Sequence, residues 1–188
     1  GACIAKCMEI AAQMEKEDPK VFIPQQFINP DNPEVHRRYT AMEILSQVDG
    51  PIHGFCSGVG TGGTITGIGE TLKKHFPDIE IWAVEPENAA ILSGGSIGTH
   101  LQMGIGDGLI PENLNTQIYQ HVCIVTDEEA LGAARRMASE EGILCGISSG
   151  SNIAAAVKLA RKLGKGKTVV TVLPDTGERY FSTPLFCE

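Results

Sequence analysis

Apolar and polar positions alternate in blocks along this chain of 188 residues, and each block has the length of one strand or one helix. Residues 2–16 place Ile4, Met8 and either Cys7 or Ile10 at helical spacing, which predicts a helix. Short apolar runs predict strands. These runs are residues 21–23, 52–56, 79–84, 122–125 and 168–173.

Helices are expected between these runs, because several of the intervening stretches open with residues that favour a helix start. Asn32 is suited to cap a helix whose first position is Pro33, and Thr126 with Glu129 matches a capping box. The expected helices run from Asn32 to about Gln47, over 65–75, from Thr126 to near Gly142, and from the serine-rich cap 148–151 to about Leu163.

Strands that alternate with helices imply parallel pairing with helical crossovers. The sequence therefore predicts an α/β fold with a doubly wound, mostly parallel sheet and flanking helices. The stretch 86–120 is rich in Gly and Pro and is expected to be irregular.

Composition supports a folded core and excludes several function classes. Apolar residues make up 42% of the chain and aromatic residues only 5%, so we expect a core of Ile, Val, Leu and Ala. The length allows one domain, or one domain and part of another. A net charge of −8 without a Lys/Arg cluster argues against a nucleic-acid surface. No apolar run reaches the roughly 18 residues that a membrane span needs, so no contact with a membrane is expected.

Cysteine and histidine usage adds two expectations. The six cysteines form no C-x-x-C pair, and Cys56, Cys123 and Cys145 lie in apolar runs. They are expected to be buried thiols in a reducing compartment, so the sequence predicts a cytoplasmic protein. The five histidines are scattered without the spacing of metal ligands, so no metal site is expected.

The most specific motif is the glycine-rich sequence GVGTGGT at 58–64, which lies between a predicted strand and a predicted helix. Such a turn presents free backbone N–H groups and the positive end of a helix dipole, and its two threonines add hydroxyl donors. It is neither a Walker loop, because no Lys follows, nor a clean G-x-G-x-x-G dinucleotide turn. A phosphate is the expected ligand, and a close-packed glycine turn without a ligand is the alternative.

Two further polar segments also lie at the ends of expected strands: 146–149 at the end of the apolar run 143–147, and 174–177 after the strand at 168–173. Ligands in doubly wound sheets bind beyond the carboxyl ends of the strands, so both segments are expected near the glycine-rich turn, with 104–108 folded over the same mouth. Ser148 and Ser149 offer hydroxyls that can hydrogen-bond a heteroaromatic nitrogen, and Ser148 is equally suited to be a plain helix N-cap. Asp107 is either a functional carboxylate or a turn residue beside glycine.

Together these motifs resemble cysteine synthase, that is O-acetylserine sulfhydrylase, within the fold-type-II pyridoxal-phosphate enzymes that also contain cystathionine β-synthase. The matching segments follow the family order over nearly the whole chain. They are QQF with NP within 25–30, GVGTGGT at 58–64, His100 with GIG at 104–106, GIL with GISSG within 142–150, and GERY at 177–180.

The resemblance implies pyridoxal 5′-phosphate as the cofactor and an amino acid as the substrate. The implied reaction is β-replacement on an activated serine or cysteine, which makes cysteine with sulfide as the nucleophile. The residues implied to hold the cofactor are Gly60, Thr61, Gly62, Gly63 and Thr64 at the phosphate, and Ser148 at the pyridine nitrogen with Asp175 and Thr176 close by. The residues implied at the substrate are Gln26, which helps bind its carboxylate, Phe27, Gly104 and Gly106.

Part of the family pattern has no counterpart in this sequence. The family uses a Schiff-base lysine and a substrate loop in its amino-terminal half, and neither is found here. The chain therefore resembles the carboxy-terminal portion of such an enzyme. Residues 1–30 are expected to end the smaller substrate-binding domain, and residues 31–188 to form the larger cofactor domain. The partner implied is the missing amino-terminal half, in a homodimer, and this chain alone is not expected to catalyse the reaction.

Asp107 is a second departure, because cysteine synthases commonly carry a small apolar residue at that place. A carboxylate near the substrate can act as a general base. The alternative reaction is therefore a cysteine-consuming β-replacement that releases hydrogen sulfide, of the lanthionine or cystathionine synthase type. Leu101 stands where a basic residue often binds serine acetyltransferase, so that partner is not expected. Two more hypotheses stay open at this point: a catalytically silent phosphate-binding fragment and an ordinary nucleotide-binding module.

Overall fold

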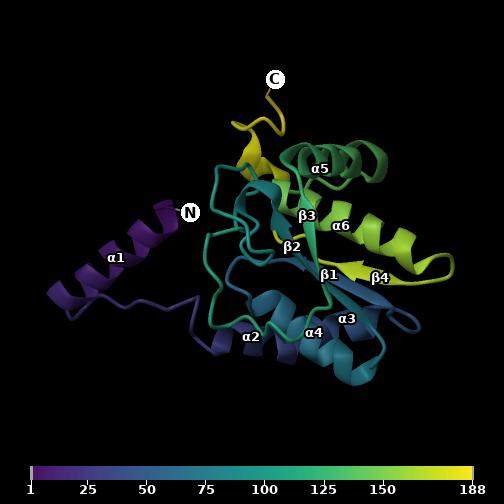
Figure 1. Ribbon diagram of the computed structural model, residues 1–188, viewed down its shortest axis with the longest axis horizontal. Coiled ribbons are helices and arrows are strands. Elements are labelled where there is room, and N and C mark those ends of the chain that lie inside the picture. Colours follow the sequence, from purple (N-terminus) through teal and green to yellow (C-terminus); the bar gives the residue numbers. More distant parts are fainter. Residues whose placement is uncertain (1, 188) are drawn as a thin grey trace.

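The computed structural model describes residues 2–187, and a parallel sheet of four strands forms its centre (Figure 1). The strands lie in the order β3-β2-β1-β4, and every neighbouring pair is parallel. Because consecutive parallel strands need crossover connections, helices cover both faces. The strands are β1 (Gly54–Gly58), β2 (Glu80–Pro86), β3 (His121–Val125) and β4 (Val169–Thr171).

Two hydrophobic layers enclose the sheet, since successive strand residues point to opposite faces. Phe55 and Ile81 pack with α3 and α4 on one face, and Cys56 and Trp82 pack with α5 and α6 on the other. The helices are α1 (Ala2–Glu17), α2 (Asp31–Val35), α3 (Ala41–Gln47), α4 (Gly63–His75), α5 (Asp127–Glu141) and α6 (Ile147–Leu163). A π-helical turn, η1 (His36–Thr40), joins α2 to α3, and two 3₁₀ turns are η2 (Glu87–Ala89) and η3 (Gly177–Tyr180).

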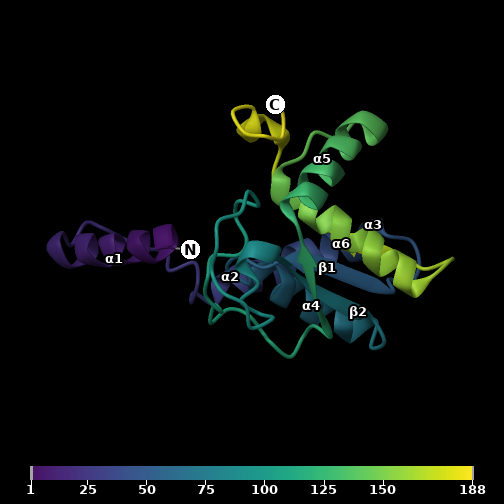
Figure 2. The ribbon, with the colours of Figure 1, turned by 45° about the horizontal axis from the view of Figure 1, so that its top comes forward.

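Helix α1 stands apart from this body. Both ribbon views place it to one side, joined to α2 by an irregular segment (Figure 2). A hollow of about 320 Å³ lies between α1 and residues 23–27, and its lining includes Ile4, Met8 and Phe27. Met8, Ile10 and Met14 on this helix are each at least 41% exposed, which is unusual for large apolar side chains on a stable helix.

The structure confirms the predicted fold class, and most predicted elements lie within two residues of the observed ones. The predicted strand at 21–23 is wrong, because these residues pair with no strand among residues 2–187 and precede Pro24. Asn32 does not cap its helix, which begins one residue earlier behind Pro30. The helix predicted behind the 148–151 cap begins at Ile147, with Gly146 as its N-cap. The capping box of Thr126 and Glu129 is confirmed.

Candidate active site

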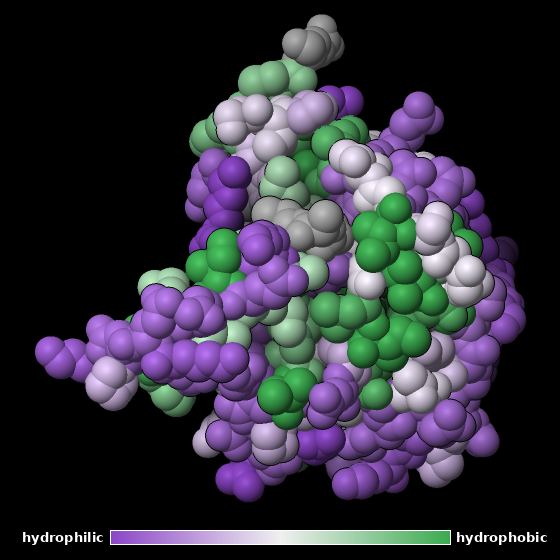
Figure 3. Space-filling view, turned by 60° about the vertical axis from the view of Figure 1, so that its left-hand side comes forward, coloured by the Kyte–Doolittle hydropathy of each residue, from purple (hydrophilic) through white to green (hydrophobic). Residues whose placement is uncertain are grey.

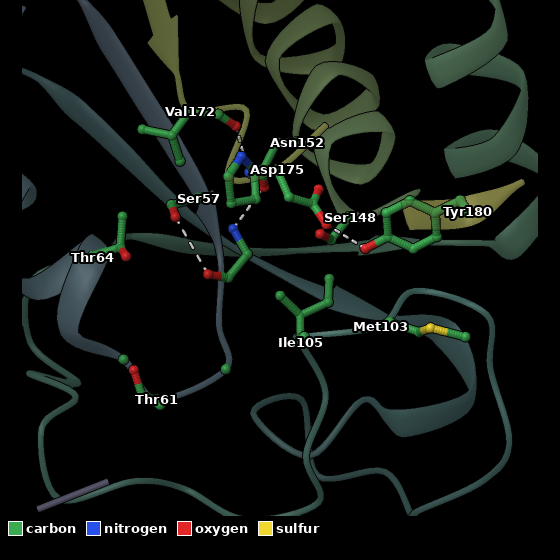
Figure 4. Close-up of a pocket in the computed structure, with 15 residues that line it drawn as sticks. Ser57, Thr61, Thr64, Met103, Ile105, Ser148, Asn152, Val172, Asp175 and Tyr180 are labelled. Atoms are coloured by element: carbon green, nitrogen blue, oxygen red, sulfur yellow. Dashed lines mark hydrogen bonds between the residues drawn. The ribbon is translucent and has the colours of Figure 1, made fainter. Parts of the chain in front are cut away.

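A cavity of about 360 Å³ opens where the carboxyl ends of β1 and β4 meet the start of α6 (Figure 4). This is the edge at which parallel sheets bind ligands. The glycine-rich turn, the 103–105 loop, the start of α6 and the segment after β4 all contribute to it. The lining residues are Ser57, Gly58, Gly60, Thr61, Gly62, Thr64, Met103, Gly104, Ile105, Ser148, Asn152, Val172, Pro174, Asp175 and Tyr180.

One wall of the cavity is the glycine-rich turn, which leads from β1 into α4. Within residues 2–187, the backbone N–H groups of 60–65 donate to no backbone carbonyl, as expected for a helix start. Gly62 has φ of +81°, a conformation that glycine adopts without strain. A Cβ on Gly60 would lie 2.3 Å from the carbonyl oxygen of Gly104, so only glycine fits there. The turn is therefore built to receive an anion.

The hydroxyls of Thr61 and Thr64 form hydrogen bonds with side chains of the α2–η1 segment. The Asn32 side-chain amide donates to Thr61 Oγ1 at 2.8 Å. The His36 Nε2 atom lies 3.2 Å from Thr64 Oγ1, and its Nδ1 atom lies 3.0 Å from Thr40 Oγ1. Burial lowers the pKa of His36, so its neutral form is favoured in the folded protein.

The facing wall carries Ser148, Asp175 and Tyr180 (Figure 4). Ser148 lies in the first turn of α6 and is buried. The Tyr180 hydroxyl donates to Asp175 Oδ2 at 2.5 Å, and Ser149 Oγ donates more weakly to Asp175 Oδ1 at 3.5 Å. Burial, together with this carboxylate, raises the pKa of Tyr180. The Ser148 hydroxyl and the hydrogen-bonded Asp175 carboxylate thus lie opposite the glycine-rich turn.

Three polar side chains of the lining were not identified as site residues from the sequence: Ser57, Asn152 and Tyr180. The Asn152 side chain accepts from the Gly58 N–H at 2.7 Å and donates to the Val172 carbonyl at 2.8 Å, so it ties α6 to the ends of two segments of the sheet. Asn152 lies one helical turn after Ser148, and this i, i+4 spacing was the available signal. Ser57 is a buried residue near the end of β1.

The 104–108 loop folds over the glycine-rich turn, as expected. Gly104 and Ile105 line the cavity, and the Gly106 N–H donates to the Val59 carbonyl at 3.0 Å. Gly106 and Asp107 line a small neighbouring recess with Glu85 instead of the cavity itself. Burial raises the pKa of Asp107, and the nearby His100 partly opposes that shift. Asp107 is thus a half-buried carboxylate close to Gly60, behind the cavity rim.

The remaining predicted site residues lie around the cavity without lining it. Gly63 begins α4 and packs against Asn32. Thr176 pairs with Cys145 in a short antiparallel bridge beside Asp175. Gln26 and Phe27 line the hollow under α1, on a different side of the turn. Among the described residues, no group of His, Cys, Asp and Glu side chains is placed to hold a metal ion, and no helix has the length and apolarity to cross a membrane.

Comparison with known proteins agrees with this geometry. A family model described as pyridoxal-phosphate dependent enzyme matches residues 2–175. The cysteine synthase of Staphylococcus aureus is 56% identical over 172 residues, which are 91% of this chain and 56% of that protein. The chain therefore spans little more than half the length of the curated relatives that it matches.

Solved structures of similar enzymes also match most of this chain with about half of their own length. The cysteine synthase of Entamoeba histolytica superimposes with a TM-score of 0.90 at 41% identity, over 95% of this chain and 53% of that one. A hydrogen sulfide-producing enzyme of Fusobacterium nucleatum gives a TM-score of 0.90 at 38% identity, over 96% of this chain and 55% of that one.

Proposed function

This chain belongs to the family of pyridoxal-phosphate-dependent enzymes, and on that premise we propose that the intact protein is a cysteine synthase. It would replace the β-substituent of an activated serine with sulfide and so form cysteine. The observation that carries this proposal is the cavity that joins the glycine-rich turn to Ser148 and Asp175. The cysteine synthases of S. aureus and E. histolytica support it.

The family's cofactor is pyridoxal phosphate, and the residues present fit it. Its phosphate suits the unused N–H groups of 60–65 and the hydroxyls of Thr61 and Thr64, because a helix start favours an anion. The space beside Gly60 would be filled by any side chain. For the pyridine nitrogen we propose Ser148, a buried neutral hydroxyl that lines the facing wall of the cavity.

When bound, pyridoxal phosphate supplies an electron sink that eases the loss of an α-proton and a β-substituent from an amino acid. The protein's own residues set the conditions around it. The Ser148 hydroxyl offers a hydrogen bond without a full charge, so it does not hold the ring nitrogen protonated as a carboxylate would. The Asp175 carboxylate is engaged by Tyr180 and Ser149, which keeps it from that role.

The intact protein must supply what this chain does not bring to the cavity. No lysine lies among the residues that line it within 2–187. We propose that a further part of the protein carries the Schiff-base lysine and covers the exposed side of α1. Residues 1–30 would then end the smaller domain. Apolar side chains also gather on the face of the body beside α1, where such a part would rest (Figure 3). Homodimer formation and the lack of serine acetyltransferase binding remain predictions from the sequence.

One observation favours a second reaction. Asp107 is a half-buried carboxylate with a raised pKa near the cofactor turn, which suits a general base. Such a base supports a β-replacement that consumes cysteine and releases hydrogen sulfide. The structural likeness to a hydrogen sulfide-producing enzyme of F. nucleatum is consistent with this alternative.

The test is a comparison of two reactions in the intact protein loaded with pyridoxal phosphate. Cysteine formation from O-acetylserine and sulfide should exceed sulfide release from cysteine if the first proposal holds. The reverse ranking would favour the second. The 188-residue chain alone should turn over neither substrate, because a lysine is needed to take the α-proton. Turnover by the purified chain would contradict the need for the further part.

A further inference from the structure

The segment that carries Gln26 is held in an unusual backbone conformation. Gln25 has φ of +57° and is the only non-glycine residue within 2–187 with a positive φ. This left-handed conformation is costly for a residue with a Cβ, so it persists only where the surroundings enforce it. The turn closes when the N–H groups of Ile28 and Asn29 donate to the Gln25 carbonyl at 2.9 and 2.8 Å.

Two asparagine side chains hold the next carbonyl in place. The Asn32 amide donates to the Gln26 oxygen at 2.7 Å, and the Asn113 amide donates to the same oxygen at 2.8 Å. The two anchors differ in what else they reach. Asn32 also donates to Thr61 Oγ1 at 2.8 Å, whereas, among the described residues, the side chain of Asn113 makes no hydrogen bond to the glycine-rich turn.

Asn32 is also fixed against the start of α4. A Cβ on Gly63 would lie 1.9 Å from Asn32 Oδ1, so the missing side chain of Gly63 is what lets the amide sit there. The Asn32 amide donates to Thr61 Oγ1, so the Thr61 hydroxyl is the acceptor in this hydrogen bond. Its own proton remains available for a second hydrogen bond, for example to an anion in the cavity that Thr61 lines. One amide thus joins the Gln26 backbone to a hydroxyl of the anion-binding turn.

We propose that Asn32 is a positioning residue that couples the cofactor-phosphate turn to the Gln26 segment. An anion held by Thr61 then steadies the strained turn at Gln25, and a displaced Gln26 loosens Thr61, since coupling between two sites acts equally in both directions. The functional meaning of this link, cofactor at one end and substrate carboxylate at the other, rests on the proposed function. The link itself rests on the contacts of Asn32.

The test is a double-mutant cycle read by amide hydrogen exchange at Ile28 and Asn29, whose N–H groups close the strained turn. Thr61→Val removes the hydroxyl while keeping the shape. It should speed exchange at both amides by about fivefold, the effect of one lost hydrogen bond. In the Asn32→Ala and Asn32→Leu backgrounds Thr61→Val should add nothing. The Leu variant keeps the side-chain size without any polar atom, so the test survives if the Ala variant fails to fold.

Asn113→Ala is the matched control, because it removes the other anchor of the same carbonyl. In that background Thr61→Val should still speed exchange as in the wild type. The proposal is overturned if Thr61→Val leaves Ile28 and Asn29 unchanged, or if it acts equally with and without the Asn32 amide.

A ligand arm separates this inference from the proposed function. Pyridoxal phosphate should slow exchange over residues 60–65 in the wild type, and should slow it at Ile28 and Asn29 in the wild type and in Asn113→Ala. In Asn32→Leu the protection at 60–65 should remain while that at Ile28 and Asn29 is lost. If pyridoxal phosphate slows exchange at 60–65 neither in the wild type nor in the variants, the proposed function fails. The double-mutant cycle of Thr61→Val with the Asn32 variants, which needs no ligand, still tests the Asn32 link.

Discussion

Ser148 and Asp107 illustrate how burial and partners assign roles to single side chains. Ser148 is buried at the cavity wall without being the helix cap, so its hydroxyl is not committed to that role. Asp107 is half-buried beside Gly60 with a raised pKa, and it faces a recess instead of the cavity. A carboxylate whose pKa is shifted by burial beside a cavity is typical of a functional position.

Asp107→Asn should separate the two proposed reactions in the intact, cofactor-loaded protein. The amide keeps the shape and cannot accept a proton, so sulfide release from cysteine should fall about tenfold or more, in line with the loss of a general base. Cysteine formation from O-acetylserine should change much less. Steady-state rates of both reactions provide the measurement, and Asp78→Asn on the surface is the control. Equal losses in both reactions would leave Asp107 as a turn residue.

His36 should make stability depend on pH. Its pKa is lowered in the folded protein by burial, so the unfolded chain binds the proton more readily. Its contribution to the free energy of unfolding is therefore fully present above about pH 6.5, the usual pKa of histidine, and is lost as the pH falls toward the folded value. Urea midpoints between about pH 7.5 and 5.5 should fall less steeply in His36→Gln, because glutamine does not titrate. Parallel curves for the two proteins would contradict this assignment.

The start of helix α5 is determined by a local sequence signal, the capping box of Thr126 and Glu129. Thr126 Oγ1 accepts from the Glu129 N–H at 3.1 Å, and the Glu129 carboxylate accepts from the Thr126 N–H at 3.1 Å. Thr126→Ala should lower the free energy of unfolding by about 1 kcal/mol, because the N–H groups of α5 lose this partner. Thr126→Asp should restore most of the loss. Urea denaturation of the three proteins tests this, and an unchanged midpoint in Thr126→Ala would argue that the cap is dispensable.

The sequence predicted the helices and strands whose signals are local, and it failed where distant contacts decide. Asparagine is a residue type that often caps helices, yet the Asn32 side chain instead donates to the Gln26 carbonyl and to Thr61 Oγ1. The apolar run 21–23 has strand composition, but no neighbouring strand among the described residues pairs with it. The π-helical turn η1 carries no sequence signal, because it follows from packing of α2 and η1 against α4.

The candidate site was predictable to a similar degree. The glycine-rich turn, Ser148 and Asp175 were identified from motifs and do share one cavity. Tyr180 was missed because its role depends on the contact with Asp175 after β4, and Asn152 was missed although its i, i+4 spacing from Ser148 places it on the same helix face. Gln26 and Phe27 line the hollow beside α1, which no local pattern predicted either.

At the scale of the whole molecule, the proposed function treats this chain as the cofactor-binding part of a larger protein. Hydrophobic side chains pack on both faces of the sheet, and the cavity is lined by the glycine-rich turn and by the hydroxyl of Ser148. The apolar hollow between α1 and residues 23–27 shares no lining residue with that cavity. This arrangement predicts that cofactor binding and catalysis can be separated: the phosphate is held by this chain, whereas turnover needs the further part.

The most direct measurement is a calorimetric titration of this chain with pyridoxal phosphate and with pyridoxal. The chain should bind pyridoxal phosphate saturably, inorganic phosphate should compete, and pyridoxal should bind much more weakly. Gly60→Ala should weaken binding about tenfold or more, since its Cβ would lie 2.3 Å from the Gly104 carbonyl oxygen and displace the turn that supplies the N–H donors. Gly132→Ala, where a Cβ meets nothing within 4 Å, should bind as the wild type does. Equal binding of pyridoxal and its phosphate, or wild-type affinity in Gly60→Ala, would contradict the assignment of the glycine-rich turn as the cofactor-phosphate site.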